Sequence, residues 1–126
     1  MIYSIGHDIV DNRRFSYLLD RYGEKVVDRI LSSTEKLIFV NKSQNQANYL
    51  AKRFAAKEAF AKACKTGLIA PILMPKISIV NQASGQPIFQ FDLTIRKWLE
   101  QHKITNCHLS LSDESNYSSA FVVLES

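Results

Sequence analysis

Residues of the types that bind metal ions and phosphate groups gather in two stretches of the chain. Asp8 lies near the end of the first stretch, MIYSIGHDIV, and Glu58 lies within a later one, RFAAKEAFAKACKTG. The later stretch also carries four cations, among them Arg53, Lys57 and Lys62. Mg²⁺ keeps most of its waters in proteins and binds one or two carboxylates together with phosphate oxygens. The two carboxylates therefore suit a Mg²⁺ site, and the cations suit the remaining charge of a polyphosphate.

The first stretch must place Asp8 from a β-strand. Residues 1–10 are rich in β-branched and aromatic side chains, and their alternation puts Ser4, Gly6 and Asp8 on one face. Aspartate is disfavoured inside a strand. The small neighbours Ser4 and Gly6 leave space beside its carboxylate. The alternative is an aspartate at the end of a strand that caps the following turn, which is a common role.

The later stretch predicts a long helix from about residue 47 to residue 65, in which Arg53 and Lys57 point into an apolar arc. That arc consists of Leu50, Phe54, Ala56, Phe60, Ala61 and Cys64. Charges are rarely buried without a partner. Either the arc faces a crevice that holds an anion, or the two long stems reach water. The alternative for Glu58 and Lys62 is an ordinary i,i+4 pair on the helix surface.

Alanines make this helix thin, so that another backbone or a ligand can approach it closely. Five of them lie between residues 55 and 63, and the sequence continues to a Thr66-Gly67 stop. Alanine also has the highest helix propensity, so the composition alone does not choose between these reasons.

The other predicted elements mix helices with late antiparallel strands, which is typical of an α+β domain with a small sheet packed on the long central helix. Asn12 is the predicted cap of a helix to Tyr22, and a capping box of Ser32 and Glu35 starts another helix. The remaining ranges are a helix at 24–31, strands at 76–81 and 88–91 joined by a turn at 82–87, a helix at 93–102, and strands at 107–113 and 118–125.

The totals of the sequence favour one domain over residues 1–126. The chain is 46% hydrophobic, with a net charge of +4 and two cysteines far apart in sequence. The charge suits an acidic partner or a phosphate-bearing ligand as well as an ordinary soluble surface. The sequence has no signal-peptide pattern and no apolar run of membrane-spanning length. We therefore expect a cytoplasmic protein without a membrane partner.

The chain resembles the holo-[acyl-carrier-protein] synthases, which are small phosphopantetheinyl transferases. The resemblance covers nearly the whole length and rests on IGHDIV, RILSSTE, LAKRFAAKEAFAK, SGQP and LSLSDESNYSSAFVVLE. It implies the 4′-phosphopantetheinyl transferase fold and a Mg²⁺-dependent transfer of the 4′-phosphopantetheine arm from coenzyme A to a serine of apo acyl carrier protein. Adenosine 3′,5′-bisphosphate is released, and the modified carrier protein supports fatty acid biosynthesis.

The same resemblance implies a role for each site residue. It makes Asp8 and Glu58 the catalytic residues and metal ligands. The residues that resemble coenzyme A contacts are Arg53, Lys57, Lys62, Thr66, Gly67, Gly85 and Pro87. The basic segment with Arg13, Arg14 and Arg21 is expected to meet the acidic carrier protein, although a solvated basic helix face is an equal alternative. Such synthases form homotrimers with active sites between subunits.

Three positions depart from the family pattern. His7 and Lys65 stand where relatives often carry other residues, and Asp113 stands where many relatives have histidine. A histidine contact to the substrate is therefore not carried over. The competing class is a nucleic-acid-binding module, which the basic charge permits. The sequence lacks the aromatic run, the glycine-rich clamp and the zinc knuckle of nucleic-acid-binding modules, so we expect no nucleic acid partner.

Overall fold

A computed structural model describes all residues from 1 to 126 and contains five α-helices, five β-strands and one short 3₁₀-helix. The elements in chain order are β1 (Ile2–Asp11), α1 (Asn12–Tyr22), α2 (Glu24–Ile30), α3 (Ser33–Val40), α4 (Gln46–Ala63), η1 (Met74–Lys76), β2 (Ile77–Asn81), β3 (Pro87–Phe91), α5 (Leu93–Gln101), β4 (Asn106–Asp113) and β5 (Tyr117–Glu125). The α+β class and the long central helix are confirmed.

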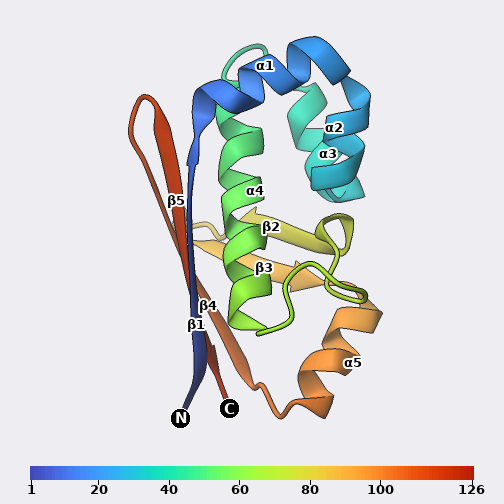
Figure 1. Cartoon of the computed structure of the whole chain (residues 1–126), viewed down its shortest axis with the longest axis vertical. Helices are drawn as coiled ribbons and strands as arrows, with labels where there is room; N and C mark the ends of the chain where they lie inside the picture. The colour runs from blue at the N-terminus through green and yellow to red at the C-terminus, as the bar shows by residue number, and fades with distance from the viewer.

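The strands form two antiparallel sheets where the sequence suggested one. The first has the order β1-β5-β4, and the second pairs β2 with β3. In Figure 1 the helices lie on one side of the first sheet, with α4 running along it. The first strand therefore pairs with the last one, Asp8 opposite Ala120. This pairing joins the two ends of the chain in one sheet.

The close contact between β1 and α4 depends on Gly6. A Cβ atom at this position would lie 1.9 Å from the backbone oxygen of Ala59, so no other residue fits without separating the two elements. Ala55, Ala59 and Ala63 are all buried along the same helix. The alanines predict a thin helix that another group approaches closely, and that group is the backbone of β1. This contact brings the strand that carries Asp8 against the helix that carries Glu58.

The second sheet packs on another side of α4 through aromatic rings. Phe60 contacts Phe91 and Phe89, with ring centroids 4.8 Å and 5.2 Å apart, and Ile77 and Ile79 are fully buried. Burial of such side chains contributes about 2 kcal/mol each to folding. The C-terminal half of the helix is thus held between two sheets.

The start of α1 differs from the prediction. Asp11 caps the helix, because its carboxylate accepts a hydrogen bond from the backbone N–H of Arg13 at 2.9 Å. Asn12 is buried inside the first turn, where its side-chain oxygen accepts a hydrogen bond from the Ser118 hydroxyl at 2.7 Å. The contact with β5 therefore takes the predicted capping residue away from the helix end.

We expect Gly6→Ala to destabilise the protein by about 2 kcal/mol or more, because the added methyl group forces β1 and α4 apart. Urea unfolding followed by circular dichroism measures this loss. Gly85→Ala is the comparison, since nothing lies within 4 Å of a Cβ atom there and only its positive φ of 91° opposes the change. A loss for Gly6→Ala no greater than that for Gly85→Ala would contradict the role of the close contact.

Candidate active site

Asp8 and Glu58 approach each other where β1 crosses α4. Asp8 follows Gly6 on the same face of the strand, and Glu58 precedes Ala59 on the helix, so the contact of Gly6 with Ala59 brings the carboxylates near. The proximity is visible in the electrostatics. The negative charge of Asp8 is the second cause, after burial, that raises the pKa of Glu58. The two carboxylates, one from each element, are therefore close enough for the charge of Asp8 to act on Glu58.

Lys62 bonds to Asp8 and not to Glu58. Its ammonium donates to the Asp8 carboxylate at 3.1 Å and to the backbone oxygen of His7 at 2.9 Å. No ion pair links Glu58 with Lys62, although the two residues are four apart on α4. The structure therefore does not contain the ordinary surface pair, and Lys62 instead links the helix to the strand.

Two cations moderate the charge of Glu58. Lys62 and Arg14 both act to lower its pKa, but burial and Asp8 outweigh them, so the pKa stays above its usual value. Arg14 belongs to α1, and its guanidinium covers the rings of Phe54 and Phe15 at 5.2 Å and 5.5 Å. Three elements, β1, α1 and α4, thus contribute charged groups to one site.

The Asp8 carboxylate fits a divalent cation. Its second oxygen, Oδ2, is buried and has no hydrogen-bond partner. Buried polar atoms are nearly always paired, so an orphaned carboxylate oxygen beside a second carboxylate is an expected ligand position. No group of three or more His, Cys, Asp or Glu residues lies together. The fit therefore rests on two carboxylates, which is sufficient for Mg²⁺ with its own waters.

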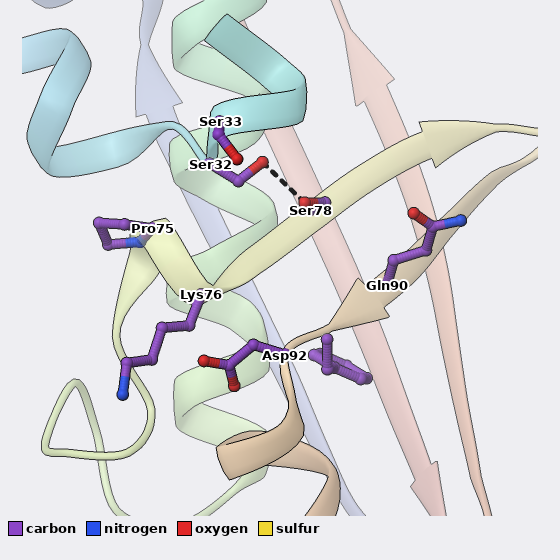
Figure 2. Close-up of a pocket in the computed structure, with 8 residues that line it drawn as sticks. Ser32, Ser33, Pro75, Lys76, Ser78, Gln90 and Asp92 are labelled. Atoms are coloured by element: carbon purple, nitrogen blue, oxygen red, sulfur yellow. Dashed lines mark hydrogen bonds between the residues drawn. The ribbon is translucent and has the colours of Figure 1, made fainter.

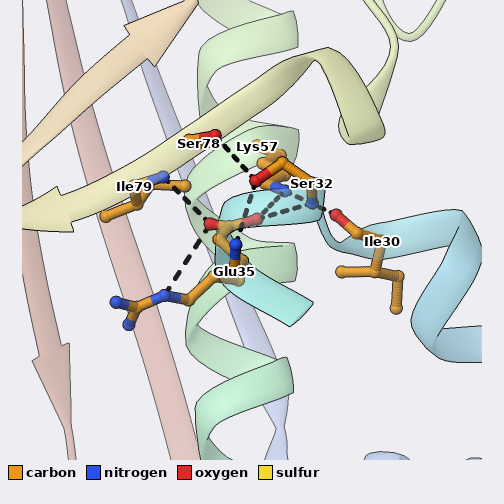
Figure 3. Close-up of polar contacts among 7 residues, drawn as sticks. Ile30, Ser32, Glu35, Lys57, Ser78 and Ile79 are labelled. Atoms are coloured by element: carbon orange, nitrogen blue, oxygen red, sulfur yellow. Dashed lines mark hydrogen bonds and ion pairs between the residues drawn. The ribbon is translucent and has the colours of Figure 1, made fainter. Parts of the chain in front are cut away.

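Lys57 has a different partner from the one that the sequence suggested. Its ammonium donates to the Glu35 carboxylate at 2.6 Å and to the backbone oxygen of Ile30 at 2.5 Å (Figure 3). The side chain is 0% exposed, and burial lowers its pKa to about 8. The prediction that Lys57 contacts a phosphate of coenzyme A is therefore wrong for this structure, because the ammonium is enclosed in the core.

Arg53 lies in the same buried cluster, but the N–H groups of its guanidinium have no hydrogen-bond partner. Its Nε lies 3.9 Å from Glu35, its guanidinium stacks on Tyr49 at 4.2 Å, and it forms no hydrogen bond. Arg53 and Glu58 are five residues apart on α4, which corresponds to about 140° around the helix. The structure therefore does not bring Arg53 to the two carboxylates within one chain.

Glu35 is the residue of this cluster that sequence reasoning missed. The capping box with Ser32 is present as predicted. However, the Glu35 carboxylate also accepts from Lys57 and from the backbone N–H of Ile79 at 2.9 Å. A lysine inside the apolar arc was the available signal, since it demanded a buried anion. The sequence offered no means of choosing which carboxylate supplied it.

The predicted nucleotide contacts occupy two exposed loops. Thr66 and Gly67 follow α4, with Gly67 at a φ of 71°, and Gly85 has a φ of 91° in the β2–β3 turn. Pro87 begins β3 and is half-buried. None of these residues bonds to Asp8 or Glu58. Their contact with a nucleotide therefore stays a prediction.

The predicted partner-binding arginines all lie on α1 but differ in their contacts. Arg13 forms an ion pair with Asp11 at 2.6 Å, and Arg21 contacts the hydroxyl and ring of Tyr22. Arg14 forms no ion pair. Arg21 forms none either, but Arg14 is the arginine of this group whose charge acts on Glu58.

Two hollows lie beside α1, α2 and the second sheet. A groove of about 1120 Å³ is lined mainly by apolar side chains, among them Leu18, Tyr22, Phe54 and Leu73. A polar pocket of about 280 Å³ lies between α3 and the second sheet, and Ser78 donates to Ser32 at its wall (Figure 2). The polar pocket contains none of the predicted site residues, whereas the apolar groove includes the Phe54 ring that Arg14 covers.

None of the helices combines the length and the apolar character that crossing a membrane requires.

Comparison with known proteins gives one family. The model of the 4′-phosphopantetheinyl transferase superfamily matches residues 4–122. The holo-[acyl-carrier-protein] synthases of Nitrosomonas eutropha and Nitrosomonas europaea are 45% and 46% identical over 125 residues, which is 99% of this chain and 99% of each relative.

Solved structures agree along the full length. The crystal structure of the holo-[acyl-carrier-protein] synthase of Neisseria meningitidis is 44% identical, with a TM-score of 0.96 and complete coverage of both chains. The corresponding protein of Bacillus anthracis, solved in complex with CoA (3′,5′-ADP), is 33% identical, with a TM-score of 0.83, and the match covers 100% of this chain and 98% of that one.

Proposed function

Because the chain belongs to the 4′-phosphopantetheinyl transferase superfamily, we propose that it transfers the 4′-phosphopantetheine arm of coenzyme A to a serine of an apo acyl carrier protein. The observation that carries the proposal is the meeting of Asp8 and Glu58 where β1 crosses α4, with an orphaned oxygen on Asp8. The proposed role is to supply active carrier protein for fatty acid biosynthesis in the cytoplasm.

Asp8 and Glu58 hold Mg²⁺ in this proposal. The ion supplies the charge neutralisation that a pyrophosphate needs when the serine oxygen attacks its β-phosphorus. Lys62 already bonds to Asp8 and to the backbone oxygen of His7, so its ammonium would add positive charge without a further ordering step. Thr66, Gly67, Gly85 and Pro87 remain the proposed nucleotide contacts.

Glu58 is also the proposed general base for the serine proton. A carboxylate accepts a proton more readily when its pKa lies closer to the working pH. In the metal-free protein, burial and the charge of Asp8 raise the pKa of Glu58 in that direction; a bound Mg²⁺ would act against this shift. The leaving group is adenosine 3′,5′-bisphosphate. Lys62 and the proposed metal ion would balance the negative charge of its phosphate until it leaves.

Arg53 fits the reaction only through a second copy of the chain. It faces about 140° away from Glu58 on α4, and its cluster of two cations and one carboxylate has a positive charge left for an anion. We therefore assign Arg53 of one copy to a phosphate of the coenzyme A held by Asp8 and Glu58 of the next. Lys57 is no longer part of the proposed phosphate-binding set.

A homotrimer is the assembly that we propose. The outer face of the β1-β5-β4 sheet has no helix on it in Figure 1. Ile5, Ile9 and Phe121 are 58%, 62% and 42% exposed there. An apolar sheet face of this kind is usual for contact with other subunits. Sedimentation equilibrium tests the proposal, and the mass of a single chain at micromolar concentration would contradict it.

The α1 face is the proposed docking surface for the carrier protein. Arg14, with Arg13 and Arg21 along the same helix, matches the acidic surface of such a partner. The neighbouring apolar groove, lined in part by Leu18 and Tyr22, supports a contact that combines charge with buried surface.

We expect Arg14→Ala to raise the KM for apo acyl carrier protein by about tenfold and the KM for coenzyme A by much less, because the charge that meets the carrier is removed. Initial rates at varied concentrations of each substrate measure the two constants. Arg96→Ala on α5 is the control, since this exposed cation lies on another element. Equal increases in both constants for Arg14→Ala would remove Arg14 from the docking surface.

The direct test of the function is incubation with apo acyl carrier protein, coenzyme A and Mg²⁺, followed by mass spectrometry of the carrier. We expect the mass of one phosphopantetheine arm to be added at a serine. An unmodified carrier would reject the proposal. A rise in melting temperature with RNA, in place of coenzyme A and Mg²⁺, would favour the nucleic-acid-binding alternative.

A further inference from the structure

Glu58 lies on α4 between two residues, Lys57 and Ala59, that each have a fixed partner. Lys57 points into the core, where it bonds to Glu35 and to Ile30. Ala59 lies against Gly6 of β1, with no space for a Cβ atom between the backbones. Adjacent side chains on a helix differ in direction by about 100°, so holding two neighbours sets the direction of the third. The contacts of Lys57 and Ala59 therefore determine where the Glu58 carboxylate points.

The contact on the Lys57 side is a buried ion pair with no freedom to rotate. Glu35 and Lys57 are both fully buried. One Glu35 oxygen accepts from Lys57 and from the backbone N–H of Ser32 at 3.0 Å, and the other accepts from the backbone N–H of Ile79. Figure 3 shows that these partners come from the N-cap of α3, from α4 and from the middle of β2. The carboxylate thus connects the helix that carries Glu58 to two other elements by directional bonds.

We propose that Glu35 is a positioning residue for the metal site. Through Lys57 it fixes the rotation of α4 about its own axis, and this rotation aims Glu58 at Asp8. The inference rests on the proposed function, because it takes Asp8 and Glu58 to be metal ligands. Glu35 itself contacts neither carboxylate of the site and acts only through the helix.

A role in stability alone would make a different prediction. Replacing both partners of a buried ion pair by apolar residues of similar size is often neutral or stabilising. Here the replacement keeps the packing but removes the directional bonds to Ser32, Ile30 and Ile79, and it also leaves Arg53, 3.9 Å from Glu35, without that carboxylate. If Glu35 positions Glu58, the double variant remains folded and still binds the metal ion less well.

The test compares Glu35→Met/Lys57→Met with the parent and with Lys36→Met. Lys36 neighbours Glu35 on α3 and forms an exposed ion pair with Asp28 at 2.7 Å, so its loss is a matched control. Binding of Mn²⁺ in the presence of coenzyme A, without carrier protein, is measured by electron paramagnetic resonance. We expect Mn²⁺ binding to weaken about tenfold in the double variant and to stay unchanged in the control.

Unchanged Mn²⁺ binding by a folded double variant would overturn the inference, as would an equal loss in Lys36→Met. If the double variant does not fold, Glu35→Asp replaces it, since the charge remains while the carboxylate is withdrawn from Lys57. We expect the same weakening there, and full binding would again overturn the inference. A parent protein that does not bind Mn²⁺ would instead contradict the proposed metal role of Asp8 and Glu58, and this inference with it.

Discussion

Glu58→Gln lowers kcat/KM for phosphopantetheine transfer by about a hundredfold or more, because it removes both a metal ligand and the proposed general base. The substitution is isosteric, and Glu58 forms no hydrogen bond within the chain, so the fold is expected to remain intact. Transfer to apo acyl carrier protein, followed by mass spectrometry, measures the loss. Glu100→Gln is the control, since that exposed glutamate lies on α5.

The stability of the metal-free protein supplies a second readout for the same variant. Burial and the charge of Asp8 raise the pKa of Glu58 in the folded state. A carboxyl group with a raised folded pKa favours folding at low pH and loses this contribution as the pH rises through that pKa. We therefore expect Glu58→Gln at neutral pH, with chelator present, to melt no lower than the parent. Full transfer activity, or an unfolded variant, would contradict the assigned role.

Mixing two inactive variants restores activity if each active site is shared between copies. Arg53→Met lacks the proposed phosphate contact, whereas Glu58→Gln lacks the metal ligand. An assembly that contains both has some sites with an intact Arg53 from one copy and an intact Glu58 from its neighbour. Random mixing in equal amounts leaves about a quarter of the sites complete, since closed assemblies repeat one contact between neighbours. Recovery of transfer after joint refolding measures this fraction.

A mixture of Asp8→Asn and Glu58→Gln is the matched control for this experiment. Both substitutions affect the same side of the proposed site, so every site that this mixture forms keeps at least one defect when Asp8 and Glu58 come from one chain. We therefore expect no recovery there. Recovery in this control, or none in the mixture with Arg53→Met, would contradict the proposed division of the site between copies.

The local patterns of the sequence were sufficient to predict most of the helices and strands. Alternation in residues 1–10 and the small residues around Asp8 predicted a strand with a functional face. The alanines of α4 predicted a helix that something approaches closely. Both predictions depend on short-range periodicity, which the sequence displays directly. The structure then shows that the approaching group is the backbone at Gly6.

The contacts that the sequence did not predict join residues far apart along the chain. Glu35 and Lys57 are 22 residues apart, and either could have paired elsewhere. The capping residue of α1 was misassigned for the same reason. Asp11 and Asn12 are both suitable caps, and the choice depends on Ser118, which reaches Asn12 from β5. The pairing of β1 with β5 was likewise not readable from local pattern.

The contact of Gly6 with Ala59 has a consequence for how quickly the proposed metal site would fill. Both carboxylates stand on regular elements whose backbones touch, and neither lies on a loop. The packing of β1 on α4 therefore holds the two carboxylates together against their mutual repulsion before any cation binds. No segment has to become ordered when a cation binds. Such a site is preorganised. Cation uptake is then governed by the loss of water from the ion and not by closure of the protein around it.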